Sequence, residues 1–170
     1  QEELIEGSAK IALDCSPAFH HYRFVERKRT HREELEQLIA QHPNGTRARI
    51  AKRAAEDVLP EMLLGYDWKT HRGVLFLDPF GLQISYRVLR QIADTQALDV
   101  FFLVSLSGLF RQAAIDESAV DEGKASKLTA FLGTDEWRSM YNRKQFDMFS
   151  DPLVTRDPSW DQILTFTTNR

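Results

Sequence analysis

Two apolar runs decide the fold class: VLFL at residues 74–77 and LDVFFLV at residues 98–104. Neither run alternates apolar with polar residues, which is typical of strands covered on both faces in a parallel sheet. Between the runs, apolar residues recur at helical spacing, at Ile84, Val88, Leu89 and Ile92. This order predicts a βαβ unit, with a right-handed crossover.

The same alternation extends towards the N-terminus. YRFVE at residues 22–26 and RIAK at residues 49–52 are two more candidate strands, and the second could start as early as Arg47. A helix over residues 30–42 separates them, and Thr30 with Glu33 matches a capping box at its start. The alternation predicts an α/β fold with a Rossmann-like, mostly parallel sheet and helices on both faces.

A further helix follows the second candidate strand, with Asp57 as its expected N-cap and Gly65 just beyond its end. We expect one domain over residues 1–150. The segment 151–170 has two prolines and few apolar residues, and it remains an unassigned C-terminal tail.

Composition excludes some classes of protein. The 170 residues carry a formal net charge of −3, so no overall basic character indicates nucleic acid, although a local basic face is compatible with that total. A single cysteine cannot form an internal disulfide. No apolar stretch approaches the roughly 18 residues that span a bilayer. We therefore expect a cytoplasmic protein.

Ligands of open α/β sheets bind beyond the carboxyl ends of the strands. Glu26 ends the first candidate strand, where a carboxylate can accept both hydroxyl protons of a ribose; the alternative is a surface glutamate paired with Arg27 or Lys28. Asp78, Pro79 and Phe80 follow the VLFL strand. There the carboxylate could hold an amino group and the ring could stack, or Phe80 could simply pack under a loop.

Other strand ends carry weaker candidates. Glu56 or Asp57 could meet a base edge, although Asp57 also suits the helix cap. The residues after the fourth strand could line a cleft, and Arg111 could meet an anion. We expect no metal site, because no two histidines have the spacing of a helical zinc pair.

Several segments together resemble one family, the three-Cys-motif partner proteins (TcmP). They are VLFLDPFGLQISYRVLRQIADT from residue 74, LDVFFLVSLSGLFRQ from residue 98 and FLGTDEW from residue 131, with shorter matches from Glu6 and at YRFVERK. The resemblance implies a bacterial protein similar to class I S-adenosylmethionine-dependent methyltransferases. It also implies a radical-SAM-type partner with three cysteines, and cofactor contacts that include Gly7 and Ser8.

The chain departs from the family pattern in three places. The glycine-rich strand and turn of the D-x-F-A-G-x-G kind is absent, Ala54 replaces an aspartate, and Ala9 replaces a proline. In that fold the glycine-rich strand lies between the strands at residues 22–26 and 74–77. Unpaired backbone groups in a buried sheet are costly. We therefore expect the strand to come from upstream residues or from a partner chain, or else from rearrangement of residues 8–14.

Two functions follow from these expectations. One is an S-adenosylmethionine-dependent methyltransferase that acts on a nucleic acid or a protein, with Glu26 on the ribose and Asp78 and Phe80 orienting the acceptor. The other is a non-catalytic Rossmann-like adaptor that binds the three-cysteine partner.

Overall fold

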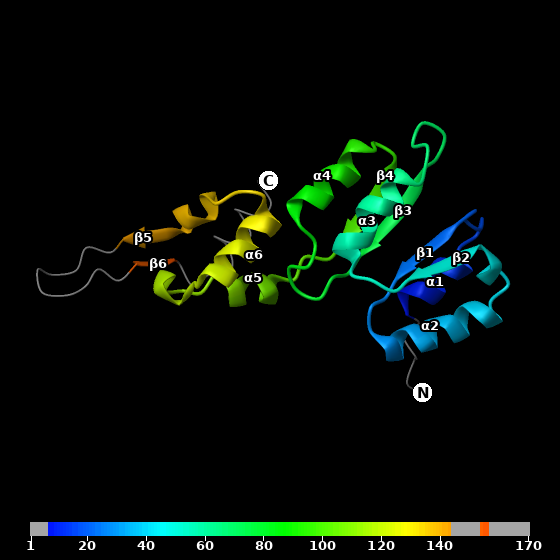
Figure 1. Ribbon diagram of the computed structural model, residues 1–170, viewed down its shortest axis with the longest axis horizontal. Coiled ribbons are helices and arrows are strands. Elements are labelled where there is room, and N and C mark those ends of the chain that lie inside the picture. Colours follow the sequence, from blue (N-terminus) through cyan, green and yellow to red (C-terminus); the bar gives the residue numbers. More distant parts are fainter. Residues whose placement is uncertain (1–6, 144–153, 157–170) are drawn as a thin grey trace, which may run out of the picture. The chain divides into compact units, whose positions relative to one another are not determined.

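A computed structural model describes residues 7–143 and 154–156, and Figure 1 shows their helices and strands. The chain divides into two compact units, residues 1–62 and residues 63–170. Within the described residues, each parallel strand pair belongs to one unit. The two units are therefore described one at a time.

The first unit is built on a parallel strand pair. Strand β1 (Tyr22–Val25) pairs with β2 (Ala48–Ala51), and Tyr22 lies opposite Ala48. Helix α1 (Ser8–Asp14) precedes β1, and helix α2 (Arg29–Gln41) with the 3-10 turn η1 (Gly45–Arg47) connects the strands. Helix α3 (Ala55–Leu64) follows β2.

One face of this strand pair forms the small core of the first unit. Leu13 of α1 is completely buried and packs with Tyr22 and Ala48, which are 5% exposed. Leu38 and Ile39 of α2 pack against this cluster. The alternation of a strand leaves the opposite face of β1 and β2 outside this core.

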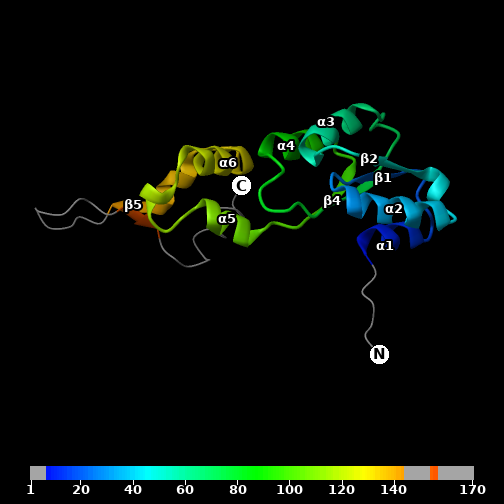
Figure 2. The ribbon, with the colours of Figure 1, turned by 60° about the horizontal axis from the view of Figure 1, so that its bottom comes forward.

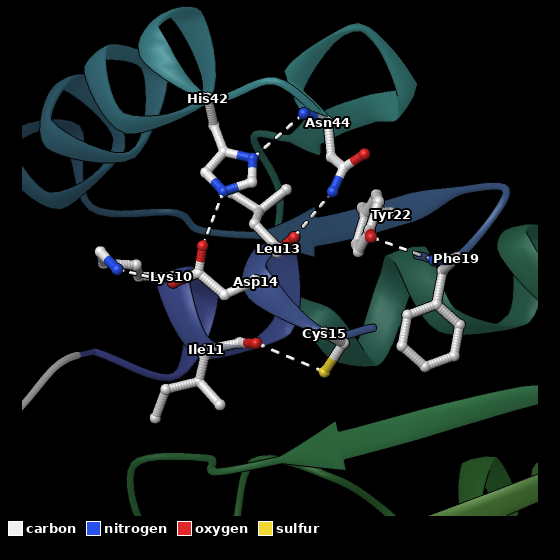
Figure 3. Close-up of polar contacts among 9 residues, drawn as sticks. All are labelled: Lys10, Ile11, Leu13, Asp14, Cys15, Phe19, Tyr22, His42 and Asn44. Atoms are coloured by element: carbon white, nitrogen blue, oxygen red, sulfur yellow. Dashed lines mark hydrogen bonds and ion pairs between the residues drawn. The ribbon is translucent and has the colours of Figure 1, made fainter. Parts of the chain in front are cut away.

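A polar network ties α1 to the end of α2 (Figure 3). His42 Nε2 lies 2.9 Å from Asp14 Oδ1, and Asn44 Nδ2 donates to the carbonyl of Leu13 at 2.9 Å. The backbone N–H of Asn44 donates to His42 Nδ1 at 3.1 Å. These bonds hold the turn after α2 against the last turn of α1.

The second unit begins with another parallel strand pair. Strand β3 (Gly73–Leu77) pairs with β4 (Leu98–Phe102), and helix α4 (Tyr86–Asp94) connects them. Ser85 caps α4, because its hydroxyl accepts the N–H of Val88. Val88 and Ile92, one turn apart, are buried, which accounts for the helical apolar spacing in the sequence.

The rest of the second unit is mainly helical. It contains α5 (Leu106–Gln112), η2 (Glu117–Ala119), α6 (Glu122–Leu132) and η3 (Glu136–Met140), and then β5 (Tyr141–Arg143) antiparallel to β6 (Val154–Arg156). Helices α5 and α6 lie side by side in both views (Figures 1 and 2). Their core centres on Trp137, which is completely buried, with Leu109 and Leu128.

The α/β class and the parallel direction of the neighbouring strands are confirmed. The four strands do not form one sheet among the described residues: β1 pairs only with β2, and β3 only with β4. Residues 8–14 are helical, so their rearrangement into a central strand is wrong. Of the expected tail, Val154–Arg156 forms β6 and the remainder lies outside the described residues.

Three local predictions need correction. The second strand covers Ala48–Ala51, one residue earlier than RIAK. Helix α2 begins at Arg29 after an N-cap at Lys28 with no side-chain cap, so Thr30 lies inside the helix and cannot form the capping box. Asp57 lies in the first turn of α3, which begins at Ala55, and is not its N-cap. In that turn its charge still favours the helix N-terminus.

Candidate functional site

The turn after β3 presents the most distinctive candidate residues. Leu77, the last residue of the strand, is 6% exposed, and the chain then leaves the core. Asp78 is exposed, and its carboxylate has no hydrogen-bond or ion-pair partner among the described residues. Phe80 is 85% exposed, so the alternative in which it packs under a loop is wrong. The carboxylate of Asp78, with no partner in the part of the chain that the structure describes, and the accessible ring of Phe80 therefore lie two residues apart.

The turn also meets the segment after β4. A Cβ on Gly108 would lie 3.0 Å from Gly81 Cα and 3.0 Å from Ser105 Oγ, so a side chain there would be crowded. Gly81 itself has φ +78°, which glycine adopts without steric cost. The structure thus brings together the loops that follow β3 and β4, as expected for adjacent parallel strands.

The polar residues after β4 are mostly engaged in local structure. Ser105 is the N-cap of α5, and its Oγ accepts the N–H of Gly108 at 3.1 Å. Ser107 Oγ lies 3.4 Å from that of Ser105. Arg111 is exposed in the last turn of α5, where a cation is favourable for the helix dipole. The serines shape this loop and offer their remaining lone pairs to solvent.

Glu26 follows β1 directly and is held by the start of α2. Its Oε1 accepts the backbone N–H of Lys28 at 2.7 Å, and its Oε2 lies 3.7 Å from His31 Nδ1. The expected alternative of a side-chain pair with Lys28 or Arg27 is replaced by this backbone contact. A carboxylate has about four lone-pair positions, so Glu26 can still accept further hydrogen bonds.

The other expected cofactor contacts lie at helix starts in the first unit. Gly7 is the N-cap of α1 and Ser8 is its first residue. Glu56 and Asp57 lie in the first turn of α3, after the carboxyl end of β2. Because β1 and β2 are parallel neighbours, Glu26 and the start of α3 follow the same edge of that strand pair. The backbone N–H of Glu26 extends the ladder by donating to Ala51 at 3.1 Å.

A hollow that the sequence did not predict lies at the other end of the β3–β4 pair. It has a volume of about 450 Å³ and is lined by Tyr66, Asp67, Trp68, Lys69, Arg72, Thr95 and Gln96. The ladder begins beside it, where Gly73 N–H donates to Ala97 at 3.0 Å. The hollow thus lies at the amino end of the strands, away from the edge where open α/β sheets hold ligands.

Several hydrogen bonds within the chain hold the loop that lines this hollow. Asp67 accepts hydrogen bonds from the N–H of Lys69 and from the hydroxyl of Thr70. Trp68 Nε1 donates to the carbonyl of Leu63 at 2.7 Å, and Arg72 donates to that of Trp68 at 2.9 Å. In the sequence, an aspartate between two aromatic residues, YDW at residues 66–68, marks this loop.

Comparisons with known proteins add no evidence on the family or the function of this chain. No family model, no curated protein and no solved structure matches this chain. Within the described residues, no group of three or more histidine, cysteine, aspartate or glutamate side chains could hold a metal ion. The helices in that part of the chain are all too short or too polar to span a bilayer.

Proposed function

We propose that the protein is an S-adenosylmethionine-dependent methyltransferase-like protein of the three-Cys-motif partner type, with a Rossmann-like fold, in the bacterial cytoplasm. The observation that carries the proposal is the turn after β3. It combines the Asp78 carboxylate, which has no partner among the described residues, with the exposed ring of Phe80, at the carboxyl end of a parallel strand. Open α/β folds place their chemistry at this edge.

The proposed roles follow from side-chain chemistry. The cofactor, when bound, would supply a methyl group on a positively charged sulfonium. Glu26 would accept the ribose hydroxyls. Gly7 and Ser8 are further cofactor contacts that the resemblance implies, and Glu56 or Asp57 would meet the base edge because they follow β2. Asp78 would accept a hydrogen bond from an amino group of the acceptor, and Phe80 would stack on a flat acceptor ring. Methyl transfer of this kind depends mainly on positioning.

The carboxylate of Glu26 suits the ribose end of the cofactor, because ribose hydroxyls are hydrogen-bond donors. The glycine-rich turn that would approach the rest of the cofactor is absent from the 170-residue sequence. The expectation that upstream residues or a partner chain supply a central strand therefore stays part of the proposal. It is supported by the pairing of β1 with β2 alone and of β3 with β4 alone among the described strands.

Calorimetry with S-adenosylhomocysteine tests the cofactor assignment. We expect saturable heat, and at least tenfold weaker binding for Glu26→Gln, which loses the charge that strengthens hydrogen bonds to hydroxyls. Glu34→Gln is the matched control, because Glu34 is exposed on α2 and has no partner among the described residues. Absence of both heat and a thermal shift at millimolar ligand would contradict the proposal.

A second candidate function, a non-catalytic adaptor for the three-cysteine partner, is favoured by an exposed apolar face. Phe76 of β3 lies opposite Phe101 of β4, and the two are 55% and 60% exposed. Val74, two residues before Phe76 on β3, is 53% exposed, and Leu103, two residues after Phe101 and just past β4, is 58% exposed. Two-stranded parallel sheets are normally covered on both faces. A protein partner is one way to cover this face.

Co-purification distinguishes the adaptor from the enzyme. An adaptor keeps its partner after Glu26→Ala and Asp78→Ala, and loses it after Phe101→Asp. Phe80→Asp is the control, because Phe80 is also an exposed phenylalanine but lies in the turn after β3. If Glu26→Ala and Asp78→Ala abolished the effect of the protein in cells while the partner stayed bound, the adaptor function would be excluded.

A further inference from the structure

Two arginines lie directly opposite each other on the first strand pair. Arg23 of β1 and Arg49 of β2 are partners in the parallel register, so their side chains leave the same face of the sheet. Both are exposed. Neighbouring strands are about 4.8 Å apart, and like charges placed opposite each other destabilise a sheet. The two positively charged side chains therefore repel each other at this position of the fold.

These arginines point away from the core. Tyr22 and Ala48, their neighbours along each strand, are the buried residues, and strand alternation directs Arg23 and Arg49 to the other face. Arg47, two residues before Arg49, is also exposed, and its Nη1 donates to the carbonyl of Phe19 at 3.2 Å. We call these three exposed arginines, two on the strand pair and one in the η1 turn before β2, the arginine face.

The charges of this region are unevenly distributed. Residues 20–53 contain nine lysines and arginines but only four glutamates. The carboxylates neutralise cations elsewhere: Glu33 pairs with Arg29, and Glu36 with Arg32 and Lys52. Neither Arg47 nor Arg49 forms an ion pair with another described residue. Among the described residues of this region, Arg47 and Arg49 therefore keep a positive charge that no carboxylate offsets, as does the exposed Arg27.

Backbone carbonyls hold the three guanidinium groups in place. Arg23 donates to the carbonyl of Tyr22 at 3.2 Å, and Arg49 donates to those of Ala48 and Thr46 at 2.7 Å and 3.2 Å. A carbonyl is neutral, so the bonds of Arg47 and Arg49 orient these side chains without cancelling their charge. Side chains oriented before binding lose less entropy when they meet an anion. Arginine carries five N–H donors, so each side chain retains donors for a ligand.

We propose that the arginine face binds the phosphodiester backbone of a single-stranded nucleic acid. Guanidinium groups side by side, in a region where cations outnumber carboxylates, suit a ligand with regularly repeated negative charges. Phe19, 37% exposed, and the exposed His20 and His21 shortly precede Arg23 in the chain. Single-strand-binding surfaces combine such rings, on which bases stack, with a basic track. The proposal does not rest on methyl transfer, because a strand can bind this face with no cofactor present.

Fluorescence anisotropy with a labelled single-stranded 20-mer DNA tests the proposal on the full chain. We expect Arg23→Gln/Arg49→Gln to weaken binding at least tenfold at 50 mM salt. The control Arg29→Gln/Arg53→Gln removes the same net charge from arginines that pair with Glu33 and Glu61, and we expect a change within about twofold, as surface ion pairs contribute little. Equal loss in both double variants would overturn the proposal, because net charge would then explain it.

Salt dependence provides a second readout. Each neutralised phosphate of a single strand contributes about 0.7 to the logarithmic slope, so three contacts predict a roughly 20-fold loss between 50 and 200 mM salt. The Arg23→Gln/Arg49→Gln variant should lose only about threefold over this range. Tighter binding of duplex DNA, or binding of phosphatidylglycerol vesicles without binding of the 20-mer, would also overturn the proposal. Unchanged or higher thermal stability of the variant shows that it is folded, since the substitution relieves repulsion.

Discussion

The imidazole of His42 lies 2.9 Å from the carboxylate of Asp14, a contact that joins residues 28 positions apart (Figure 3). Lys10 contacts the other carboxylate oxygen of Asp14 at 2.6 Å. These two hydrogen bonds, that of Lys10 first and that of His42 second, lower the pKa of Asp14 from its ordinary value of 3.8. The ionised form of Asp14 is therefore favoured in the folded state.

This shift predicts an acid-dependent contribution to stability. A carboxylate with a lowered pKa in the folded state stabilises the fold above its ordinary pKa, and this contribution is lost as the pH falls through the lowered value. Asp14→Asn should therefore lower the melting temperature modestly at pH 7. The gap between the variant and the original protein should narrow from about pH 5 downwards. Thermal unfolding at pH 7, 5, 4 and 3 measures this gap, with the exposed Asp94→Asn as control. A gap that does not change with pH would contradict the role of Asp14.

Gly133 marks a position where only glycine fits. It ends α6 with φ +73°, and a Cβ there would lie 2.3 Å from Cδ1 of Tyr86. Gly133→Ala combines an unfavourable left-handed backbone with this overlap, so we expect a loss of at least about 2 kcal/mol of unfolding free energy. For a chain of this size, that lowers the melting temperature by roughly 4–8 °C.

Gly7→Ala is the control for this substitution. Gly7 has φ −66°, and a Cβ there would meet nothing within 4 Å. Because Gly7 is the N-cap of α1 and alanine is a poorer cap than glycine, we expect a loss of no more than about 1 kcal/mol. Calorimetric melting of both variants checks the pair, and equal destabilisation would show that the geometry at Gly133 is not the cause.

The alternation of apolar strands and amphipathic helices predicted much of the fold. VLFL and LDVFFLV became β3 and β4 because short uninterrupted apolar runs favour strands, but the expected cover on both faces is not present among the described residues. Helix boundaries were less predictable, because caps depend on local geometry. Arg29 begins α2 without a side-chain cap, although Thr30 and Glu33 have the spacing of a capping box. The separation of the strands into two pairs involves long-range pairing, which periodicity does not encode.

The candidate site was predictable where it follows strand ends. Asp78 and Glu26 both occupy such positions, as the order of elements implies. The backbone contact of Glu26 with Lys28 was not predictable, because it depends on how the chain turns into α2. The arginine face was not predictable for a similar reason. Arg23 and Arg49 are 26 positions apart in the sequence, and only the register of β1 with β2 makes them neighbours.

A buried hydrogen bond in the helical core gives another test. Trp137 is completely buried, and its Nε1 donates to Thr129 Oγ1 at 2.9 Å. Thr129→Val keeps the shape of the side chain but removes the acceptor, so the indole N–H loses its partner. We expect a loss of about 1–3 kcal/mol. Thr129→Ser keeps the hydroxyl and should cost less. Urea denaturation monitored by tryptophan fluorescence compares the two, and a serine variant as unstable as the valine variant would contradict the importance of this bond.

Leu77 and Phe80, three residues apart, should respond oppositely to truncation. Leu77 is 6% exposed at the end of β3, so Leu77→Ala should cost about 2–5 kcal/mol through lost burial and the cavity left behind. Phe80 is 85% exposed, so Phe80→Ala should change stability by no more than about 0.5 kcal/mol. Urea denaturation of both variants measures these values. If Phe80→Ala were as destabilising as Leu77→Ala, the ring would belong to the core, and its proposed role in stacking on an acceptor would be lost.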